Sequence, residues 1–177
     1  MEIELRGVNL AVGEMSANVY INGGLRGSVE GDSSGIIYSS QGLCDELKSY
    51  ADELPEVEVW ESDSDGVHMS KVRLSPERLI ERLVHREDVA RRMAGCILLV
   101  KDGEVKSMKT EISSEMLDAI LSSPAWVEKF KAKHKVHPDF ILNGMHIDDI
   151  ALAVGDMPAF LAKQASESLS DAPAMSI

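Results

Sequence analysis

The chain has 177 residues, of which 44% are aliphatic, aromatic or cysteine, and a mean hydropathy near zero, so a disordered or collagen-like protein is excluded. With 30 acidic and 18 basic residues the net charge is −12, which disfavours general affinity for nucleic acid or an anionic membrane. Two cysteines make no disulfide framework, and neither a signal peptide nor a membrane span is visible, so we expect a cytoplasmic protein.

Three strands are expected in the N-terminal part. Apolar and polar residues alternate over 2–12, and further strand patterns occupy 17–21 and 25–29. Asn22-Gly23-Gly24 lies between the last two and supplies residues that tolerate positive φ, which predicts a tight hairpin. Residues 31–35 are expected to form a loop before a short strand at 36–38.

The middle of the chain predicts two helices. Residues 41–54 have one apolar face, and Pro55 ends the helix. A strand is expected at 57–60, followed by an acidic loop at 61–66. Ser75-Pro76 is a strong helix start, and this helix should run to about Met93 with Ala90 and Met93 among its buried residues.

The last third predicts one more hairpin and then helices. Residues 96–100 and 105–110 flank an Asp102-Gly103 turn. Helices should follow at 113–121, from 123, at 147–153 and at 157–165, with a short strand near Phe140. We therefore expect an α+β fold: an antiparallel sheet built from two hairpins, packed helices and a helical C-terminal third. Residues 1–165 should form a single domain and 166–177 a flexible polar tail.

Several short motifs favour a structural role over a functional one. Glu61–Gly66 begins like an EF-hand loop, but its twelfth position is Val72 where a bidentate Glu is needed, so a solvated acidic loop is favoured. The glycines between 23 and 35 follow hairpin strands rather than forming a phosphate loop, since no Gly-Lys pair is present. No nucleophile elbow occurs, and Cys44 and Cys96 are expected to be buried and inert.

One histidine-rich stretch offers candidate metal ligands. Histidine and carboxylate side chains can bind zinc or another divalent ion, and the weak candidates are His134, His137, His146 and Asp148, with Asp149 as an alternative carboxylate. Four nearby lysines would repel a cation, so surface histidines are favoured. We expect no cofactor.

Charge is segregated along the chain. Residues 45–65 contain a single base, Lys48, and nine acids: Asp45, Glu46, Asp52, Glu53, Glu56, Glu58, Glu61, Asp63 and Asp65. A basic helix at 73–92 and four lysines at 129–135 carry the opposite charge. The blocks could pair internally or lie in solvent, or the acidic block could dock a charged partner. The basic helix leaves direct binding of nucleic acid open, although the net charge disfavours it.

The hairpin from Ala17 to Gly27 begins a stretch of sequence that resembles other proteins. Together with the helix at 79–93, the strand and Lys-Asp-Gly turn at 97–103, and Phe140–Asn143, it resembles small uncharacterised proteins of phages and bacterial mobile elements. The resemblance covers about residues 17–145, although the loop at 30–35 is less glycine-rich here. Its motifs are structural, so it implies a source class and no reaction.

The leading hypothesis is a non-enzymatic, acidic interaction protein, encoded by a phage, that binds a host protein with a basic surface through the nine acids. Mimicry of nucleic acid is one form this binding could take. A metal-dependent hydrolase using His134, His137 and His146 is the alternative. A structural or oligomerisation module, with the helix of Trp126 and Phe130 at a subunit contact, is a third; the oligomeric state is left open.

Overall fold

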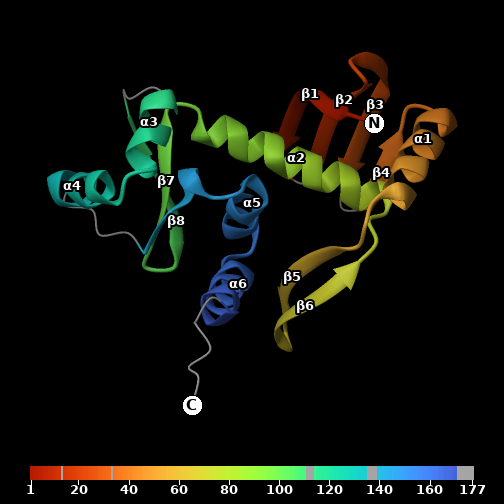
Figure 1. Cartoon of the computed structure of the whole chain (residues 1–177). Coiled ribbons are helices and arrows are strands. Elements are labelled where there is room, and N and C mark those ends of the chain that lie inside the picture. Colours follow the sequence, from red (N-terminus) through yellow and green to blue (C-terminus); the bar gives the residue numbers. More distant parts are fainter. Residues whose placement is uncertain (13, 33, 111–113, 135–138, 171–177) are drawn as a thin grey trace. The chain divides into compact units, whose positions relative to one another are not determined.

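The computed structural model describes residues 1–12, 14–32, 34–110, 114–134 and 139–170. The α+β fold is confirmed: antiparallel sheets are combined with helices, which dominate the C-terminal part (Figure 1). The backbone divides into two compact units, Met1–Val59 with Ser70–Asp88 and Trp60–Met69 with Val89–Ile177. Whether 1–165 folds as one cooperative domain stays a prediction.

The first unit contains a four-stranded antiparallel sheet with the order β1-β2-β3-β4. Its strands are β1 (Ile3–Ala11), β2 (Glu14–Ile21), β3 (Gly24–Asp32) and β4 (Gly35–Tyr38). The predicted hairpin is confirmed: Ile21 pairs with Gly24, and Asn22 and Gly23 have φ of 50° and 78°. The expected loop at 31–35 is much shorter, because β3 continues to Asp32 and β4 begins at Gly35.

A β-bulge in β1 sets which side chains face the core. The register shifts between Arg6 and Asn9, so Gly7 and Val8 lie opposite the single residue Ala17 of β2. Gly7 has φ of 64°, the left-handed conformation that such a bulge requires. The extra residue allows Leu5 and Val8, three positions apart, to point into the same core.

Two helices complete the first core. Helix α1 (Gln41–Glu53) begins after Ser40, whose Oγ accepts a hydrogen bond from the Leu43 backbone N–H at 3.2 Å, and α2 (Pro76–Met93) begins after Ser75. Gly27 allows α1 to approach the sheet, because a Cβ there would lie 3.1 Å from Leu43 Cδ2. The core consists of Leu5, Val8, Ala17, Val19, Ile21, Val29, Leu43, Leu47, Ala51, Leu74, Leu79, Ile80 and Val84.

A two-stranded hairpin joins the units along the chain. Strand β5 (Val57–Asp63) pairs with β6 (Gly66–Val72), so the acidic segment 61–66, predicted as a loop, is mostly strand with a two-residue turn. Asp63 Oδ1 accepts a hydrogen bond from the Asp65 N–H at 2.8 Å, and Gly66 has φ of 123°. The EF-hand reading is therefore not supported by the local backbone.

The second unit is built around β7 (Cys96–Lys101), which lies between β8 (Glu104–Lys109) and the two-residue strand β9 (Phe140–Ile141). Asp102 and Gly103 form the predicted turn with φ of 55° and 73°. The 3₁₀ turn η1 is Leu142–Gly144, and the helices are α3 (Ser114–Leu121), α4 (Pro124–His134), α5 (Ile147–Gly155) and α6 (Met157–Ser170). The second core is formed by Val89, Leu98, Val100, Leu142, Ile150, Ala153 and Phe160.

Three details differ from the sequence prediction. Ala90 of α2 is exposed and Met93 is only half-buried, whereas Val89 is buried. Both cysteines are half-buried rather than buried. Helix α6 continues to Ser170, so 166–170 is helical instead of part of a tail, and 171–177 lies outside the described residues.

Aromatic residues are divided between the units. All three tyrosines, Tyr20, Tyr38 and Tyr50, belong to the first unit. Both tryptophans and all three phenylalanines belong to the second.

Candidate interaction surface

Helix α1 presents carboxylates on its outer side while Leu43, Leu47 and Ala51 are buried on its inner side. Asp45 and Asp52 lie seven residues apart and therefore on the same side of the helix, and both are exposed. Glu53 is the last residue of α1, and exposed Glu56 follows three residues later. We call Asp45, Asp52, Glu53 and Glu56 the acidic surface of α1.

Little positive charge lies against this surface. Within the part of the chain that the structure describes, no cation lies within ion-pair distance of Asp52, Glu53 or Glu56. Two other predicted acids of this unit are paired: Glu46 Oε1 lies 3.8 Å from Arg26 Nε, and Glu58 Oε1 lies 3.7 Å from Lys71 Nζ. The sequence block is therefore partly neutralised, and the acidic surface of α1 is the part that is not.

The charges of α1 oppose its helix dipole. The first turn contains no acidic residue and the last turn no basic residue, although Asp52 and Glu53 are the final two residues. Free carbonyl groups give a helix C-terminus partial negative charge, so each carboxylate there destabilises the helix by about 0.3–1 kcal/mol. A stabilising arrangement would have the reverse order, which means that helix stability does not account for these acids.

The remaining three predicted acids belong to the second unit. Glu61, Asp63 and Asp65 are exposed on the β5-β6 hairpin, and Asp63 Oδ2 lies 3.7 Å from His68 Nδ1. The nine acids thus do not all belong to one compact unit. The structure groups Asp45, Glu46, Asp52, Glu53, Glu56 and Glu58 in the first unit and Glu61, Asp63 and Asp65 in the second.

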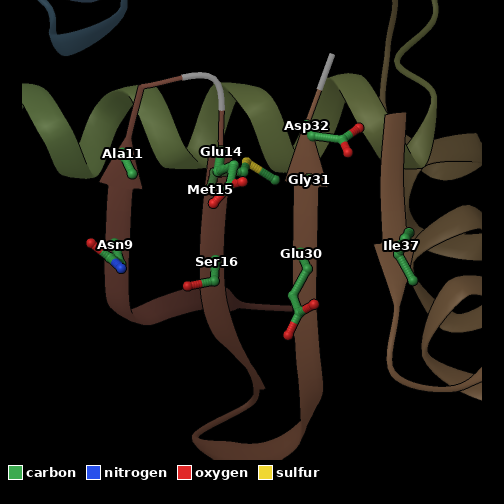
Figure 2. A pocket seen from close by; sticks show the side chains of 9 residues that line it. All are labelled: Asn9, Ala11, Glu14, Met15, Ser16, Glu30, Gly31, Asp32 and Ile37. Atoms are coloured by element: carbon green, nitrogen blue, oxygen red, sulfur yellow. The ribbon is translucent and has the colours of Figure 1, made fainter. Parts of the chain in front are cut away.

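A hollow that the sequence did not predict lies on the sheet of the first unit. It encloses about 390 Å³ and is lined by Asn9, Ala11, Glu14, Met15, Ser16, Glu30, Gly31, Asp32 and Ile37 (Figure 2). Asn9, Ser16, Glu30 and Ile37 form a row across four strands, because each pairs with the next. The row lies on the face of the sheet opposite α2, as Figure 2 shows.

This hollow brings three carboxylates together. Glu14 pairs directly with Asp32 across β2 and β3, and Glu30 is two residues before Asp32 on the same strand. Like charges opposite each other destabilise a sheet. Hydrogen bonds from the Ser34 hydroxyl and backbone N–H lower the pKa of the Asp32 carboxyl below its ordinary value, so this group is ionised at neutral pH.

A second hollow, of about 490 Å³, belongs to the second unit. Its lining includes the apolar residues Leu98, Val105 and Ala153 and the charged residues Arg92 and Glu104. Arg92 has an interaction partner of its own. The hollow therefore combines an apolar surface with two opposite charges and does not concentrate either sign.

The candidate metal ligands are brought together only in part. His146 caps α5: its Nδ1 accepts a hydrogen bond from the Asp148 backbone N–H at 3.3 Å and lies 3.5 Å from the Asp148 carboxylate. Asp149 instead pairs with Lys163 at 2.5 Å. The side chain of His134 and all of His137 lie outside the described residues, and among the described residues no group of three suitable ligands is found.

Comparison with protein families, with curated proteins and with solved structures finds no match to this chain. No described helix is both long enough and apolar enough to cross a membrane.

Proposed function

We propose that this protein is a non-enzymatic interaction protein of the cytoplasm that binds a partner protein with a basic surface through the acidic surface of α1. The observation that carries the proposal is the placement of Asp52, Glu53 and Glu56. These carboxylates are exposed, have no cation within ion-pair distance in the described chain, and include two at the helix end where charge of this sign is unfavourable.

A partner with complementary charge would remove this unfavourable interaction on binding. Opposite charges across an interface also accelerate association and exclude partners with the wrong charge. Carboxylates spaced along a helix face can occupy a cationic groove that otherwise holds phosphates, so mimicry of nucleic acid is one form of the proposal. The resemblance to phage proteins makes a bacterial host protein the expected partner.

The proposal is tested with two charge-matched variants. Asp52→Asn/Glu53→Gln/Glu56→Gln removes three of the four charges of the acidic surface of α1, and Glu61→Gln/Asp63→Asn/Asp65→Asn removes the same charge from the β5-β6 hairpin. Each tagged protein is used for capture from a bacterial host lysate at low and high salt. We expect a partner that the wild type and the hairpin variant retain at low salt and that the α1 variant loses.

The affinity of the captured partner is then measured by calorimetry. We expect the α1 variant to bind at least about tenfold more weakly, since charge pairs at interfaces contribute about 1.5 kcal/mol or more. Removing two charges that oppose the dipole should raise the free energy of unfolding of this variant by about 0.3–1 kcal/mol per charge. Equal binding by both variants, or the absence of any discriminated partner, would contradict the proposal.

A further inference from the structure

Helix α4 carries a local positive charge in a chain whose total charge is −12. Trp126, Lys129 and Lys133 are exposed and follow one another at spacings of three and four residues. At about 100° per residue they fall within an arc of roughly 60° on the helix surface. We call these three side chains the Trp-Lys face of α4.

The helix is anchored through other residues. Val127 and Phe130 line a small apolar gap together with Leu117, Ile120 and Leu121 of α3. Lys131, which is 27% exposed, forms an ion pair with Glu128 at 3.1 Å. Figure 1 shows α4 beside α3 at the margin of the second unit. The Trp-Lys face is therefore not needed to hold α4 in place.

An exposed tryptophan is unusual, because its large apolar surface is normally covered. Trp126 is 56% exposed, and Lys129 Nζ lies 5.3 Å from the centre of its ring. A cation over an aromatic ring is held by the ring's electrostatic field, so Lys129 is held over one face of the ring rather than directed away from it, and the other face is the one on which a base would stack. An aromatic plane with an adjacent ammonium group is the combination that recognises an unpaired base and its phosphate.

We propose that the Trp-Lys face of α4 binds single-stranded nucleic acid. Trp126 would stack on one base, and Lys129 and Lys133, about 6 Å apart along the helix axis, would contact neighbouring phosphates. The site is separate from the acidic surface of α1. The high net negative charge disfavours binding elsewhere on the chain, and two phosphate contacts give this site a modest salt dependence.

An anionic membrane is the main competing ligand. Interfacial helices bury a broad apolar face, usually with several large side chains. On α4 the apolar residues Val127 and Phe130 are half-buried against α3, which leaves a single exposed ring. One ring is sufficient to stack on a base but buries little area in a lipid surface, so the observations favour the nucleic acid.

Binding is tested by fluorescence, because the chain has only two tryptophans. In a Trp60→Phe variant, Trp126 is the sole tryptophan and can be excited selectively, and a short oligothymidylate added at low salt should quench it saturably. By anisotropy of a labelled oligothymidylate, Trp126→Ala should bind about ten- to a hundredfold more weakly, whereas Trp126→Tyr, which keeps an aromatic plane, should bind within a few-fold of the wild type.

The two lysines are tested by salt dependence. Lys129→Gln/Lys133→Gln should reduce the slope of log affinity against log salt by about 1.4, which corresponds to two phosphate contacts on a single strand. The charge-matched control Lys48→Gln/Lys71→Gln changes lysines of the first unit and should leave the slope unchanged. Circular dichroism of each variant checks that α4 is still folded.

The alternatives give distinguishable results. If oligothymidylate does not quench the fluorescence of Trp126, the proposal is overturned. A blue shift of the Trp126 emission with phosphatidylserine vesicles would then assign the face to a membrane. Light scattering that shows a dimer abolished by Trp126→Ala would assign it to a second copy of the chain. If the control variant Lys48→Gln/Lys71→Gln lowered the salt slope equally, the binding would be general electrostatic attraction, and the proposal would also be overturned.

Discussion

In the first unit the described core is entirely apolar, whereas the core of the second unit includes one buried polar side chain, Asn143. Its Oδ1 accepts a hydrogen bond from the Leu98 N–H at 2.7 Å, and its Nδ2 donates to the Cys96 carbonyl at 3.1 Å. Strand β9 is only two residues long, so the Asn143 amide continues its pairing with β7 after the backbone has turned away. The first unit depends on filled volume, and the second depends also on specific hydrogen bonds.

The largest effect is expected in the apolar core. Leu47 is fully buried between α1 and the sheet, so Leu47→Ala should lower the free energy of unfolding by about 2–5 kcal/mol through lost burial and a cavity. Urea denaturation measures the loss, and amide hydrogen exchange should accelerate more in β2 and β3 than in β7. Leu25→Ala, at a position that is 60% exposed, is the control and should change stability little. Equal acceleration in all strands would instead show that both units unfold as one domain.

A smaller effect is expected in the second unit. Asn143→Ala would leave the Leu98 N–H and the Cys96 carbonyl without their partner, which should cost about 1–3 kcal/mol. The matched change Asn18→Ala removes an exposed amide from β2 and should have little effect. Urea denaturation compares the two, and hydrogen exchange should accelerate in β7. If both variants were equally stable, hydrogen bonding would not distinguish the two cores.

The smallest effect concerns acid stability. Burial raises the pKa of the Asp156 carboxyl, but hydrogen bonds from Ser62 and Ala159 outweigh this, so the pKa lies below its ordinary value of 3.8. A carboxyl with a lowered folded pKa stabilises the fold above its unfolded pKa, and this contribution is lost as the pH falls through the folded value.

Because Asp156 accepts a hydrogen bond from the Ala159 N–H in the first turn of α6, Asp156→Ala should cost about 0.5–2 kcal/mol at neutral pH, as for other helix N-caps, and less as the pH falls below 3.8. Denaturation over a series of acidic pH values measures the difference. The variant Glu104→Gln, which changes an exposed carboxylate of the same unit, provides the comparison. A cost that did not shrink in acid would show that the ionised form is not the stabilising one.

Turn chemistry was the most reliable guide to the fold. Asn22-Gly23 and Asp102-Gly103 predicted both hairpins because their residues tolerate the positive φ observed there. The helix start at Ser75 followed in the same way from local capping. These features depend on a few neighbouring residues, so a single sequence contains the information.

Features that depend on distant residues were missed. The hollow of Figure 2 forms because Glu14 lies opposite Asp32. This pairing depends on a register shift between Val19 and Tyr20, which cannot be found by counting residues back from the hairpin turn. Ala90 was assigned to the buried face because one helical periodicity was extended through α2. The helix contributes Leu79, Ile80 and Val84 to the first core but Val89 to the second, so the buried face changes along its length.

The candidate surface was predicted only in outline. Composition identified the acidic segment, but it could not show that Glu46 and Glu58 have cationic partners, whereas the described residues provide none for Asp52, Glu53 and Glu56. Strand pairing and side-chain geometry decide that difference. The exposure of Trp126 likewise depends on how α4 packs on α3, which periodicity in a helix with lysines on several sides does not determine.

The division of the aromatic residues provides each unit with its own optical reporter. Because all three tyrosines belong to the first unit and both tryptophans to the second, near-ultraviolet signals from the two chromophores follow different parts of the chain without any label. Coincident melting curves would indicate a single all-or-none transition, and separated curves would indicate stepwise unfolding. The natural sequence thus contains a built-in test of cooperativity.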